Sequence, residues 1–389
     1  MSATPLLSLD EYETMAPEAL ATRIDALRRR LGDELLILGH HYQKEAILRH
    51  CDLRGDSFQL SEAAAESTAC RAIVFCGVHF MAETADILLN TQRKREHRLA
   101  AKVPEFVPVV LPDVKAGCPM AEMATAEQVR DAWVRLSDFI DPDVLVPITY
   151  VNSTAEIKAF CGYNGGLSCT SSNAAAVLRR AFERNGNNGR VLFVPDRHLG
   201  CNTAIAMGIP KEEHFLWTPG MELAEADIEA LKRCRIILWN GFCHVHRRFE
   251  PGQIDAVRAG HPGVRVIVHP ECSREIVEKA DENGSTSFII DTIARSAPGS
   301  IWAVGTEFRL VERLAKTYPD KTILNLAPQP SICETMDRIT PAKLCRSLDM
   351  IAISAPENII RVPERIASDA LLCLQRMLAC KQTVVAENR

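Results

Sequence analysis

Short apolar runs recur along the chain, and each gives way to a stretch in which apolar residues return with helical spacing. Short apolar runs bounded by Gly, Pro, Cys, His or Asp are typical of buried strands, and strands that alternate with helices form βαβ units with parallel sheets. The pattern therefore predicts an α/β protein. The predicted strands are Leu35–Leu38, Ala72–Phe75, Phe106–Leu111, Val144–Ile148, Val191–Val194, Ile236–Leu238, Val264–Val268, Ile301–Val304 and Ile323–Leu326.

So many strands exceed one ordinary sheet, so we expect two or three sheets, with boundaries near Gly117 and Asn240. Residues 1–34 read as a lead-in whose amphipathic helix, Ala19–Leu31, braces the surface. The predicted domains are residues 35–116 together with 334–389, residues 117–240, and residues 241–333.

Composition narrows the class of protein. At 389 residues with 47% hydrophobic positions, the chain can bury several cores, and a formal net charge of −5 without long basic runs argues against a nucleic-acid partner. The acidic N-terminal region does not resemble a signal peptide, and no apolar stretch reaches the length of a membrane span. We therefore expect a cytoplasmic protein whose 14 cysteines are not a disulfide framework.

Some of these cysteines could bind metal, although no pair has the C-x-x-C spacing of a local zinc or iron–sulfur motif. Cys118, Cys243 and Cys333 share one context, a loop after a strand, and are separated by 125 and 90 residues. This spacing suggests a threefold internal repeat whose sheet edges converge on one site. Cys76, Cys201 and Cys272 also follow strands, so spacing alone does not exclude them.

The segment Trp239–His246 concentrates the most chemistry, because a predicted strand delivers Cys243 and His246 to a sheet edge where a small molecule could bind. The plainer interpretation is that Cys243 is a small buried hydrophobe and His246 a structural histidine. Histidines and other polar groups also follow other strands: His40, His41 and Tyr42, then Tyr150 and Asn152, then His269 and Glu271.

Hydroxyl-bearing segments precede three predicted helices, at Gly55–Ser57, Cys169–Asn173 and Gly284–Thr286. The N–H groups at a helix N-terminus favour phosphate or carboxylate, although ordinary N-capping explains any one of these segments equally well. Neither Gly162–Gly166 nor Asn185–Gly189 matches a dinucleotide or P-loop fingerprint, so no nucleotide cofactor is expected.

Taken together, these segments resemble the quinolinate synthase family, the A-type enzymes of de novo NAD biosynthesis. No single motif is specific, but twelve occur in order. They are Gly39–Gln43, Gly55–Ser57, His79–Ala85, Gly117–Ala121, Tyr150–Ser153, Cys169–Ala174, Pro195–Gly200, Trp239–His246, His269–Cys272, Gly284–Thr286, Gly305–Glu307 and Cys333–Met336.

The resemblance implies three α/β/α domains with small parallel sheets, related by pseudo-threefold symmetry around a central cluster site. It implies a [4Fe–4S] cluster held by Cys118, Cys243 and Cys333, whose open iron acts as a Lewis acid. The family condenses iminoaspartate with dihydroxyacetone phosphate to give quinolinate, phosphate and water. A transient contact with L-aspartate oxidase, the source of the imine, is a further implication.

By motif match, the resemblance also assigns roles to residues. Glu271, Tyr42 and His246 become the proton-transfer groups, with Glu271 placed to bind the open iron or take a proton. The residues expected to hold the carboxylates and phosphate of the substrates are His40, Ser57, Tyr150, Asn152, Ser171, His269, Glu271 and Thr286.

Two features depart from the family pattern. Some relatives carry extra cysteines near the third ligand, whereas Pro330 and Met336 flank Cys333 here, so no regulatory disulfide is expected. The link Gly162–Ser168 is also longer than usual. Two alternatives stay open: an iron–sulfur hydro-lyase acting on another carboxylate, and a non-enzymatic iron–sulfur sensor, carrier or cluster-free binding module.

Overall fold

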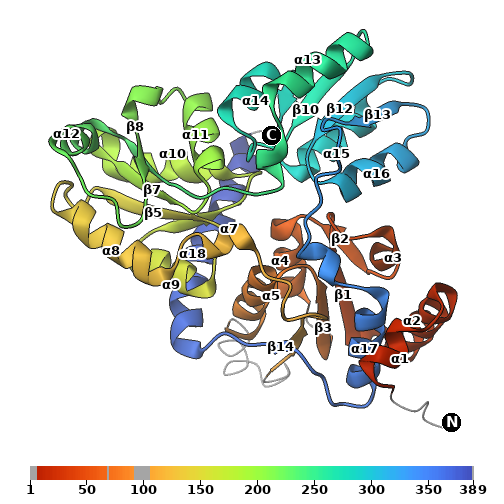
Figure 1. Cartoon of the computed structure of the whole chain (residues 1–389). Helices are drawn as coiled ribbons and strands as arrows, with labels where there is room; N and C mark the ends of the chain where they lie inside the picture. Colours follow the sequence, from red (N-terminus) through yellow and green to blue (C-terminus); the bar gives the residue numbers. More distant parts are fainter. Residues whose placement is uncertain (1–6, 68–69, 92–105, 388–389) are drawn as a thin grey trace. The chain divides into compact units, whose positions relative to one another are not determined.

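A computed structural model describes residues 7–67, 70–91 and 106–387 (Figure 1). The chain divides into two compact units. The first comprises Met1–Cys118 and Ile332–Glu364, and the second comprises Pro119–Ser331 and Arg365–Arg389. Each unit is built from parallel sheet and flanking helices, as the alternating sequence pattern predicts.

The first unit contains one five-stranded sheet in the order β14-β4-β3-β1-β2. All neighbouring strands are parallel except β14, which pairs antiparallel with β4 at one edge. The strands are β1 (Leu35–His40), β2 (Leu53–Gly55), β3 (Ala72–Cys76), β4 (Val109–Val110) and β14 (Ile359–Ile360). The helices are α1 (Leu9–Glu13), α2 (Pro17–Leu31), η1 (Gly32–Glu34), α3 (Glu45–Leu48), α4 (Ser57–Glu66), α5 (His79–Asp86), η2 (Ile87–Thr91), η6 (Met336–Arg338) and α17 (Pro341–Ala352).

The N-terminal helix packs against this unit through one apolar face. Leu20, Ile24 and Leu27 recur with helical spacing on α2 and are buried, and α2 packs on α17. Burying each aliphatic side chain contributes roughly 1.5–3 kcal/mol. The predicted brace over Ala19–Leu31 is therefore confirmed as a packed helix that begins two residues earlier, at Pro17.

The second unit contains two sheets, ordered β6-β5-β7-β9-β8 and β11-β10-β12-β13, with parallel pairing throughout. The strands are β5 (Leu145–Tyr150), β6 (Leu167–Cys169), β7 (Arg190–Val194), β8 (His214–Trp217), β9 (Ile236–Trp239), β10 (Arg265–Val268), β11 (Glu282–Asn283), β12 (Ile301–Gly305) and β13 (Thr322–Asn325). The helices are α7 (Pro119–Glu122), α8 (Ala126–Ser137), α9 (Ala155–Tyr163), α10 (Ala174–Asn185), η3 (Gly186–Asn188), α11 (Arg197–Ala206), η4 (Lys211–Glu213), α12 (Glu225–Arg233), η5 (His246–Arg248), α13 (Pro251–Gly260), α14 (Arg274–Lys279), α15 (Thr286–Arg295), α16 (Phe308–Thr317) and α18 (Glu364–Glu387).

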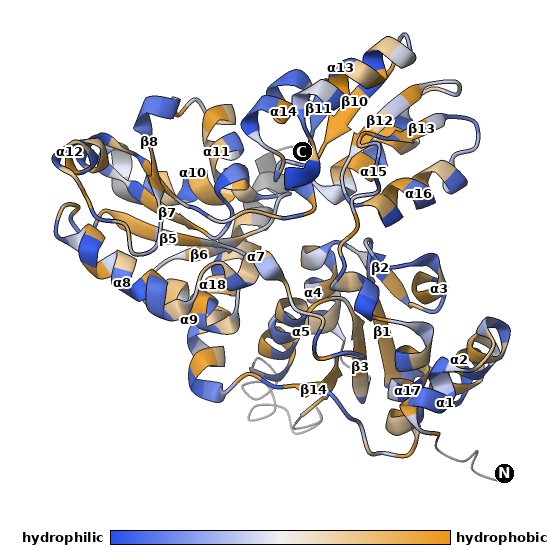
Figure 2. Cartoon of the chain, viewed as in Figure 1, coloured by the Kyte–Doolittle hydropathy of each residue, from blue (hydrophilic) through white to orange (hydrophobic). Residues whose placement is uncertain are grey.

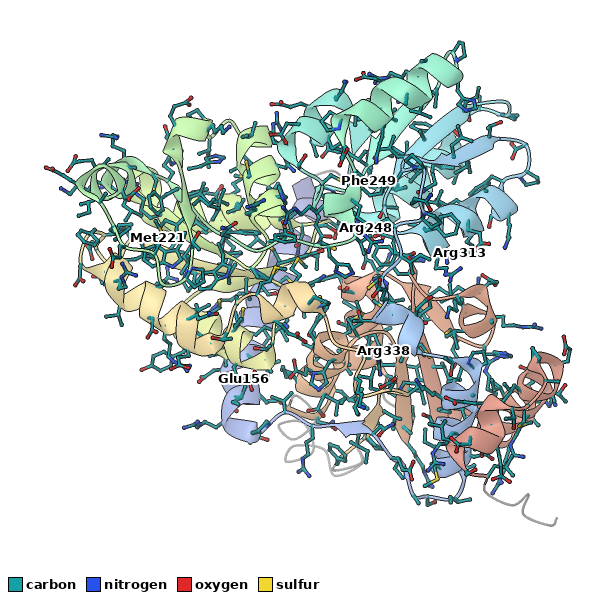
Figure 3. The ribbon with its side chains drawn as sticks, in the orientation of Figure 1. Glu156, Met221, Arg248, Phe249, Arg313 and Arg338 are labelled. Carbon is teal, nitrogen blue, oxygen red and sulfur yellow. The ribbon has the colours of Figure 1, made fainter. Side chains whose placement is uncertain are left out.

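The strands of both sheets in this unit are predominantly hydrophobic, which fits sheets covered on both faces (Figure 2). Trp217 and Trp239 belong to the core of the first of these sheets. In the core of the second, Phe249 packs beside the strand residues, whereas the preceding Arg248 is exposed (Figure 3). Each sheet thus has its own apolar support, and the polar residues collect at the strand ends.

All nine predicted strands are present, and the fold class is confirmed: the protein is α/β with three small, mainly parallel sheets. The run Phe106–Leu111 yields only the short strand β4. The pseudo-threefold arrangement and the predicted domain limits stay predictions. Within the described part of the chain, no helix is both long and apolar enough to cross a bilayer.

Candidate active site

Polar side chains of the second unit collect where its parallel strands end, the edge at which α/β sheets bind ligands. Tyr150 is the last residue of β5, and His269 directly follows β10. Thr306 directly follows β12. The loop after β9 carries Cys243 and His246, with His246 opening the short helix η5.

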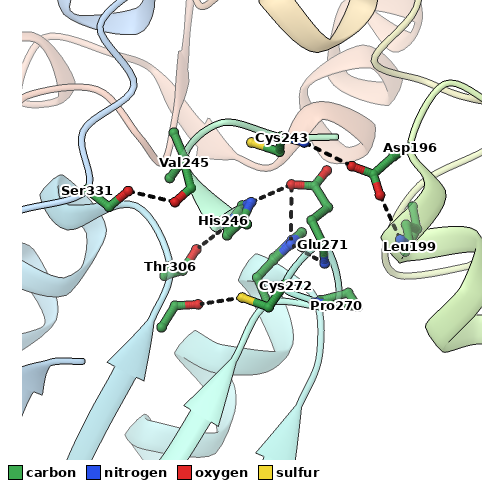
Figure 4. A network of polar contacts seen from close by, with 12 residues as sticks. Asp196, Leu199, Cys243, Val245, His246, Pro270, Glu271, Cys272, Thr306 and Ser331 are labelled. Atoms are coloured by element: carbon green, nitrogen blue, oxygen red, sulfur yellow. Dashed lines mark hydrogen bonds and ion pairs between the residues drawn. The ribbon is translucent and has the colours of Figure 1, made fainter. Parts of the chain in front are cut away.

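His246 and Glu271 face each other (Figure 4), and together with His269 they form a buried cluster. The Nδ1 atom of His246 lies 2.6 Å from Oε2 of Glu271, and Nδ1 of His269 lies 3.5 Å from the same oxygen. The two imidazole rings stack with their centroids 4.3 Å apart. With His246 at 1% and Glu271 at 3% exposure, this ion-pairing group is screened from water.

The environment holds Glu271 ionised. Burial works to raise the pKa of its carboxyl, but the His269 and His246 rings and hydrogen bonds from His246 and Tyr150 outweigh burial and lower that pKa to about 2. Burial, followed by the nearby His246, lowers the pKa of His269 to about 3.

Asp196 is a second buried carboxyl beside this cluster. Burial and the charge of Glu271 raise the pKa of Asp196 well above its usual range, against the lowering effect of hydrogen bonds from backbone N–H groups. Its Oδ1 accepts from the N–H of Leu199 at 2.7 Å, which caps α11, and its Oδ2 accepts from the N–H of Cys243 at 3.1 Å (Figure 4). Asp196 therefore joins the start of α11 to the loop that carries the thiol.

The Cys243 loop is fixed at two further points. Gly241 pairs with Asp196 in an isolated parallel bridge, and a Cβ at Gly241 would lie only 2.4 Å from the carbonyl oxygen of Pro195, so only glycine permits this approach. The hydroxyl of Ser331 donates to the carbonyl oxygen of Val245 at 2.7 Å. Beyond the loop, the Thr306 hydroxyl contacts Nε2 of His246 at 3.1 Å.

The loop that carries Glu271 is held by α11. The buried amide of Asn202 donates from Nδ2 to the carbonyl oxygens of Pro270 and Cys272, both at 2.9 Å. These carbonyls flank Glu271 in the chain. The same helix thus bonds to the Cys243 loop at its N-terminus and to the Glu271 loop through Asn202.

Cys243, His246 and Glu271 could together hold a metal ion. The Sγ, one imidazole nitrogen and one carboxylate oxygen all lie within 4.8 Å of one another. Glu271 Oε1 is buried and has no hydrogen-bond partner among the described residues, so an acceptor is available for a cation. Sulfur, imidazole and carboxylate ligands suit zinc or iron.

A buried lysine forms a hydrogen bond with the segment Tyr150–Ser153. Lys158 on α9 is fully buried and its Nζ donates to the carbonyl oxygen of Ser153, while the hydroxyls of Thr149 and Ser153 lie 2.8 Å apart. Asn152 lies on this loop, and its Oδ1 is buried without a hydrogen-bond partner in the described structure. That oxygen can accept a hydrogen bond from a ligand.

Ser171 precedes a helix and Thr286 begins one. Ser171 lies in the turn before α10, where Asn173 Oδ1 accepts from the N–H of Thr170 at 2.7 Å, a turn contact in place of a cap on the helix. Thr286 is the first residue of α15 and is buried, and the preceding Ser285 caps this helix. Thr286 therefore lies beside the N-terminal N–H groups of α15.

The first unit contains the remaining predicted site residues. His40 ends β1 and is buried, and its ring makes an edge contact with Tyr42 at 4.7 Å. Ser57 is the first residue of α4, where Asp56 acts as the cap by accepting from the N–H groups of Phe58 and Gln59. These residues share the C-terminal edge of β1 and β2, which are neighbouring strands.

Cys118 and Cys333 both belong to the first unit and are partly exposed. Gln43 donates to the carbonyl oxygen of Met336 at 3.0 Å and thereby links the loop after β1 to the segment that carries Cys333. All fourteen cysteines lie within the described residues, and none forms a disulfide. The meeting of these two thiols with Cys243 stays a prediction.

Sequence reasoning missed the residues that hold the site in place. Asp196 and Thr306 lie within the motifs Pro195–Gly200 and Gly305–Glu307. These motifs support the family resemblance, but neither residue was given a role from the sequence. Asn202 and Ser331 have no such signal. Their partners are backbone carbonyls remote in sequence, which only the tertiary fold brings near.

The fold and site define a class: an α/β protein with three small sheets and a thiol–imidazole–carboxylate donor set of the kind that binds metal. Comparison with known proteins narrows the class. The pattern of the family "Quinolinate synthetase A protein" matches residues 22–379.

Three similar curated proteins are named quinolinate synthase. The chain is 50% identical to that of Rhodopirellula baltica over 374 residues, covering 96% of this chain and 94% of the relative. It is 45% identical to that of Corynebacterium glutamicum over 370 residues (95% and 90% covered) and 44% identical to that of Bacillus subtilis over 370 residues (95% of each). The chain therefore belongs to the quinolinate synthase family and is an enzyme, which removes the sensor and binding-module alternatives.

Proposed function

We propose that this enzyme condenses iminoaspartate with dihydroxyacetone phosphate to give quinolinate, phosphate and water, a step of de novo NAD biosynthesis. Family membership supports the reaction class. The observation that carries the proposal is the group of partly exposed Cys243 and buried His246 and Glu271 at the strand ends of the second unit. The group combines a metal-binding thiol with a proton carrier, and the reaction needs both.

Cys118, Cys243 and Cys333 are the proposed ligands of a [4Fe–4S] cluster. The residues fit this cofactor, because all three thiols are reduced, partly exposed and located on loops, and because Glu271 Oε1 offers a buried acceptor without a hydrogen-bond partner in the described structure. When bound, such a cluster with three thiolates supplies an iron that acts as a Lewis acid. The remaining chemistry belongs to the side chains of this chain.

The substrates carry two carboxylates and a phosphate, which the slightly acidic protein must bind locally. In the second unit we assign this role to Tyr150, Asn152, Ser171, His269 and Thr286. The unpartnered Oδ1 of Asn152 and the helix starts at Ser171 and Thr286 support these assignments. In the first unit, His40 and Ser57 have the same role.

Proton transfer is assigned to His246, Glu271 and Tyr42. A carboxylate with a pKa near 2 is a weak base, so Glu271 suits orienting His246 or binding a cation better than removing a proton. His246, 2.6 Å from Glu271, is then the group that exchanges a proton with the substrate. Tyr42, partly exposed beside His40, supplies a second acid from the first unit.

The partners are therefore small molecules, and transient contact with L-aspartate oxidase and a cytoplasmic location stay predictions. The decisive experiment incubates anaerobically reconstituted protein with dihydroxyacetone phosphate and iminoaspartate generated from oxaloacetate and ammonia. We expect quinolinate and phosphate to appear in equal amounts. Turnover of iminoaspartate in the absence of dihydroxyacetone phosphate would favour the hydro-lyase alternative. A failure of iron-loaded protein to form quinolinate would overturn the proposal.

A further inference from the structure

The donor group of Cys243, His246 and Glu271 lies wholly within the second unit. It requires neither Cys118 nor Cys333, which belong to the first unit. A metal site assembled from one unit can exist in protein that has no iron–sulfur cluster. We propose that, in the cluster-free enzyme, these three residues bind a single divalent cation of the zinc class.

The chemistry of the donors favours such an ion. Zn²⁺ binds thiolate sulfur, imidazole nitrogen and carboxylate oxygen, and sites with three protein ligands complete the tetrahedron with water. One thiolate and one carboxylate balance the charge of a divalent cation. The hard cations Mg²⁺ and Ca²⁺ prefer oxygen ligands and are excluded by this donor set.

The contact between His246 and Glu271 already brings two possible metal ligands together. Two acceptor atoms, an imidazole lone pair and a carboxylate oxygen, cannot lie 2.6 Å apart without a shared proton or cation. A metal ion can take the place of that proton, because one ligand atom each of Cys243, His246 and Glu271 lies within 4.8 Å of the others. Glu271 Oε1 also has no hydrogen-bond partner among the described residues.

Each of the three ligands is oriented by a separate partner, as in evolved metal sites. Thr306 contacts Nε2 of His246 at 3.1 Å, which leaves Nδ1 to face the ligand group. Asp196 accepts a hydrogen bond from the backbone N–H of Cys243, and Asn202 donates to the carbonyl oxygens on either side of Glu271. Such preorganisation lowers the conformational cost of binding.

Solvent reaches this group at Cys243, which is partly exposed, whereas His246 and Glu271 are buried. A cation arriving from solvent would meet the thiol first. One consequence rests on the proposed function: a bound Zn²⁺ occupies a cluster ligand, so zinc-loaded protein should take up less iron and sulfide during reconstitution. The zinc site itself is independent of that function.

The test uses the full-length protein stripped of iron by anaerobic chelation and then loaded with one equivalent of Zn²⁺. X-ray absorption spectroscopy counts the ligands directly in the unmodified chain. We expect one sulfur and three nitrogen or oxygen neighbours. A shell of three sulfurs would place the zinc at the predicted cluster cysteines and overturn the proposal, as would a shell without sulfur.

Variants then identify the donors by isothermal titration with Zn²⁺. The double variant Cys118→Ser/Cys333→Ser should bind one equivalent with an affinity within about threefold of the unmodified protein. His246→Gln and Glu271→Gln should each weaken binding at least tenfold. Thr306→Val, which removes only the hydroxyl behind His246, should weaken it about 10- to 100-fold.

Cys201→Ser is the matched control, because this partly exposed thiol on α11 is outside the donor group. It should leave zinc affinity unchanged. Unchanged binding in both His246→Gln and Glu271→Gln would show that the ion lies elsewhere. Loss of binding in the Cys118→Ser/Cys333→Ser protein with a native circular dichroism spectrum would equally reject a site confined to the second unit.

Discussion

The two units differ in how they hold their chemistry. In the second unit, His246 contacts Glu271 and Thr306 in a buried setting, and the backbone N–H of Cys243 donates to Asp196 at the start of α11. In the first unit, His40 and Tyr42 contact each other through ring edges, and Tyr42, Ser57 and both cysteines are partly exposed. One set of groups is fixed by the fold, and the other is nearer to solvent.

This difference indicates that the two sets of groups have different roles. Groups that must keep a charged state or a fixed geometry need a dry, hydrogen-bonded setting, where electrostatic interactions are strong. Groups that receive a substrate need access. Substitutions of Glu271 and His246 in the second unit should therefore affect turnover strongly, and substitutions of Tyr42 and Ser57 in the first unit should affect turnover less.

The largest expected effect follows from Cys243→Ser. Loss of one of three cluster thiolates should remove the [4Fe–4S] cluster and with it all measurable quinolinate formation. Iron and sulfide analysis after anaerobic reconstitution, together with the visible absorption near the cluster's charge-transfer bands, checks this outcome. Cys201→Ser replaces another partly exposed thiol and should retain full iron content. Equal iron content in both variants would refute the ligand assignment.

Glu271→Gln and Tyr42→Phe test the comparison directly. Glu271→Gln removes the charge that orients His246 and should lower kcat about 10²- to 10⁴-fold with the cluster retained. Tyr42→Phe removes one partly exposed hydroxyl and should change kcat by less than Glu271→Gln does. Steady-state kinetics on iron-matched samples measures both. If Tyr42→Phe proved the more damaging to kcat, the first unit would supply the principal proton-transfer group.

Asn202→Ala should have an intermediate effect. The change leaves the buried carbonyls of Pro270 and Cys272 without their donor, which costs about 1–3 kcal/mol for each buried acceptor and loosens the Glu271 loop. We expect a 10- to 100-fold loss of kcat and faster amide hydrogen exchange in residues 269–273. Thr203→Ala, on the same helix, should change neither quantity; unaltered exchange in Asn202→Ala would show that α11 does not hold this loop.

The smallest effect concerns pH. Burial, followed by the charge of Arg197, lowers the pKa of His198 from 6.5 to about 4, and Arg197 Nε donates to its Nε2 at 3.3 Å. Below about pH 6.5, His198 binds a proton in the unfolded chain but stays neutral in the folded protein. The free energy of unfolding therefore falls as the pH drops from about 6.5 to about 4. In His198→Gln, the slope of unfolding free energy against pH should be smaller by about 1.4 kcal/mol per pH unit. Urea unfolding midpoints between pH 4.5 and pH 7 test this; identical slopes would contradict it.

Much of the fold could be predicted because buried parallel strands are near-continuous apolar runs. Val191–Val194 and Ile236–Leu238 are examples, and both became strands of the expected extent. The strands that escaped prediction are short or of mixed polarity. Leu53–Gly55 and Glu282–Asn283 lie at sheet edges and carry no apolar run, so pairing with a neighbour defines them, not their own sequence.

The candidate site was predictable to the extent that reactive residues follow strands. His246, His269 and Glu271 were predicted to follow strands, and the structure brings these side chains, from loops after strands of two sheets, into contact. The groups that orient them were not predictable, because a hydrogen bond such as that from Ser331 to Val245 spans residues far apart in sequence. Nothing in the composition of either segment indicates the contact.

Helix α11 has a mechanical consequence. It is bonded through Asp196 to the Cys243 loop and through Asn202 to the Glu271 loop, and these loops follow strands of two different sheets. If one sheet shifts relative to the other, the helix carries both loops with it. The separation of the sulfur from the carboxylate should then vary less than the separation of the sheets, so the donor group can keep its geometry while the protein around it fluctuates.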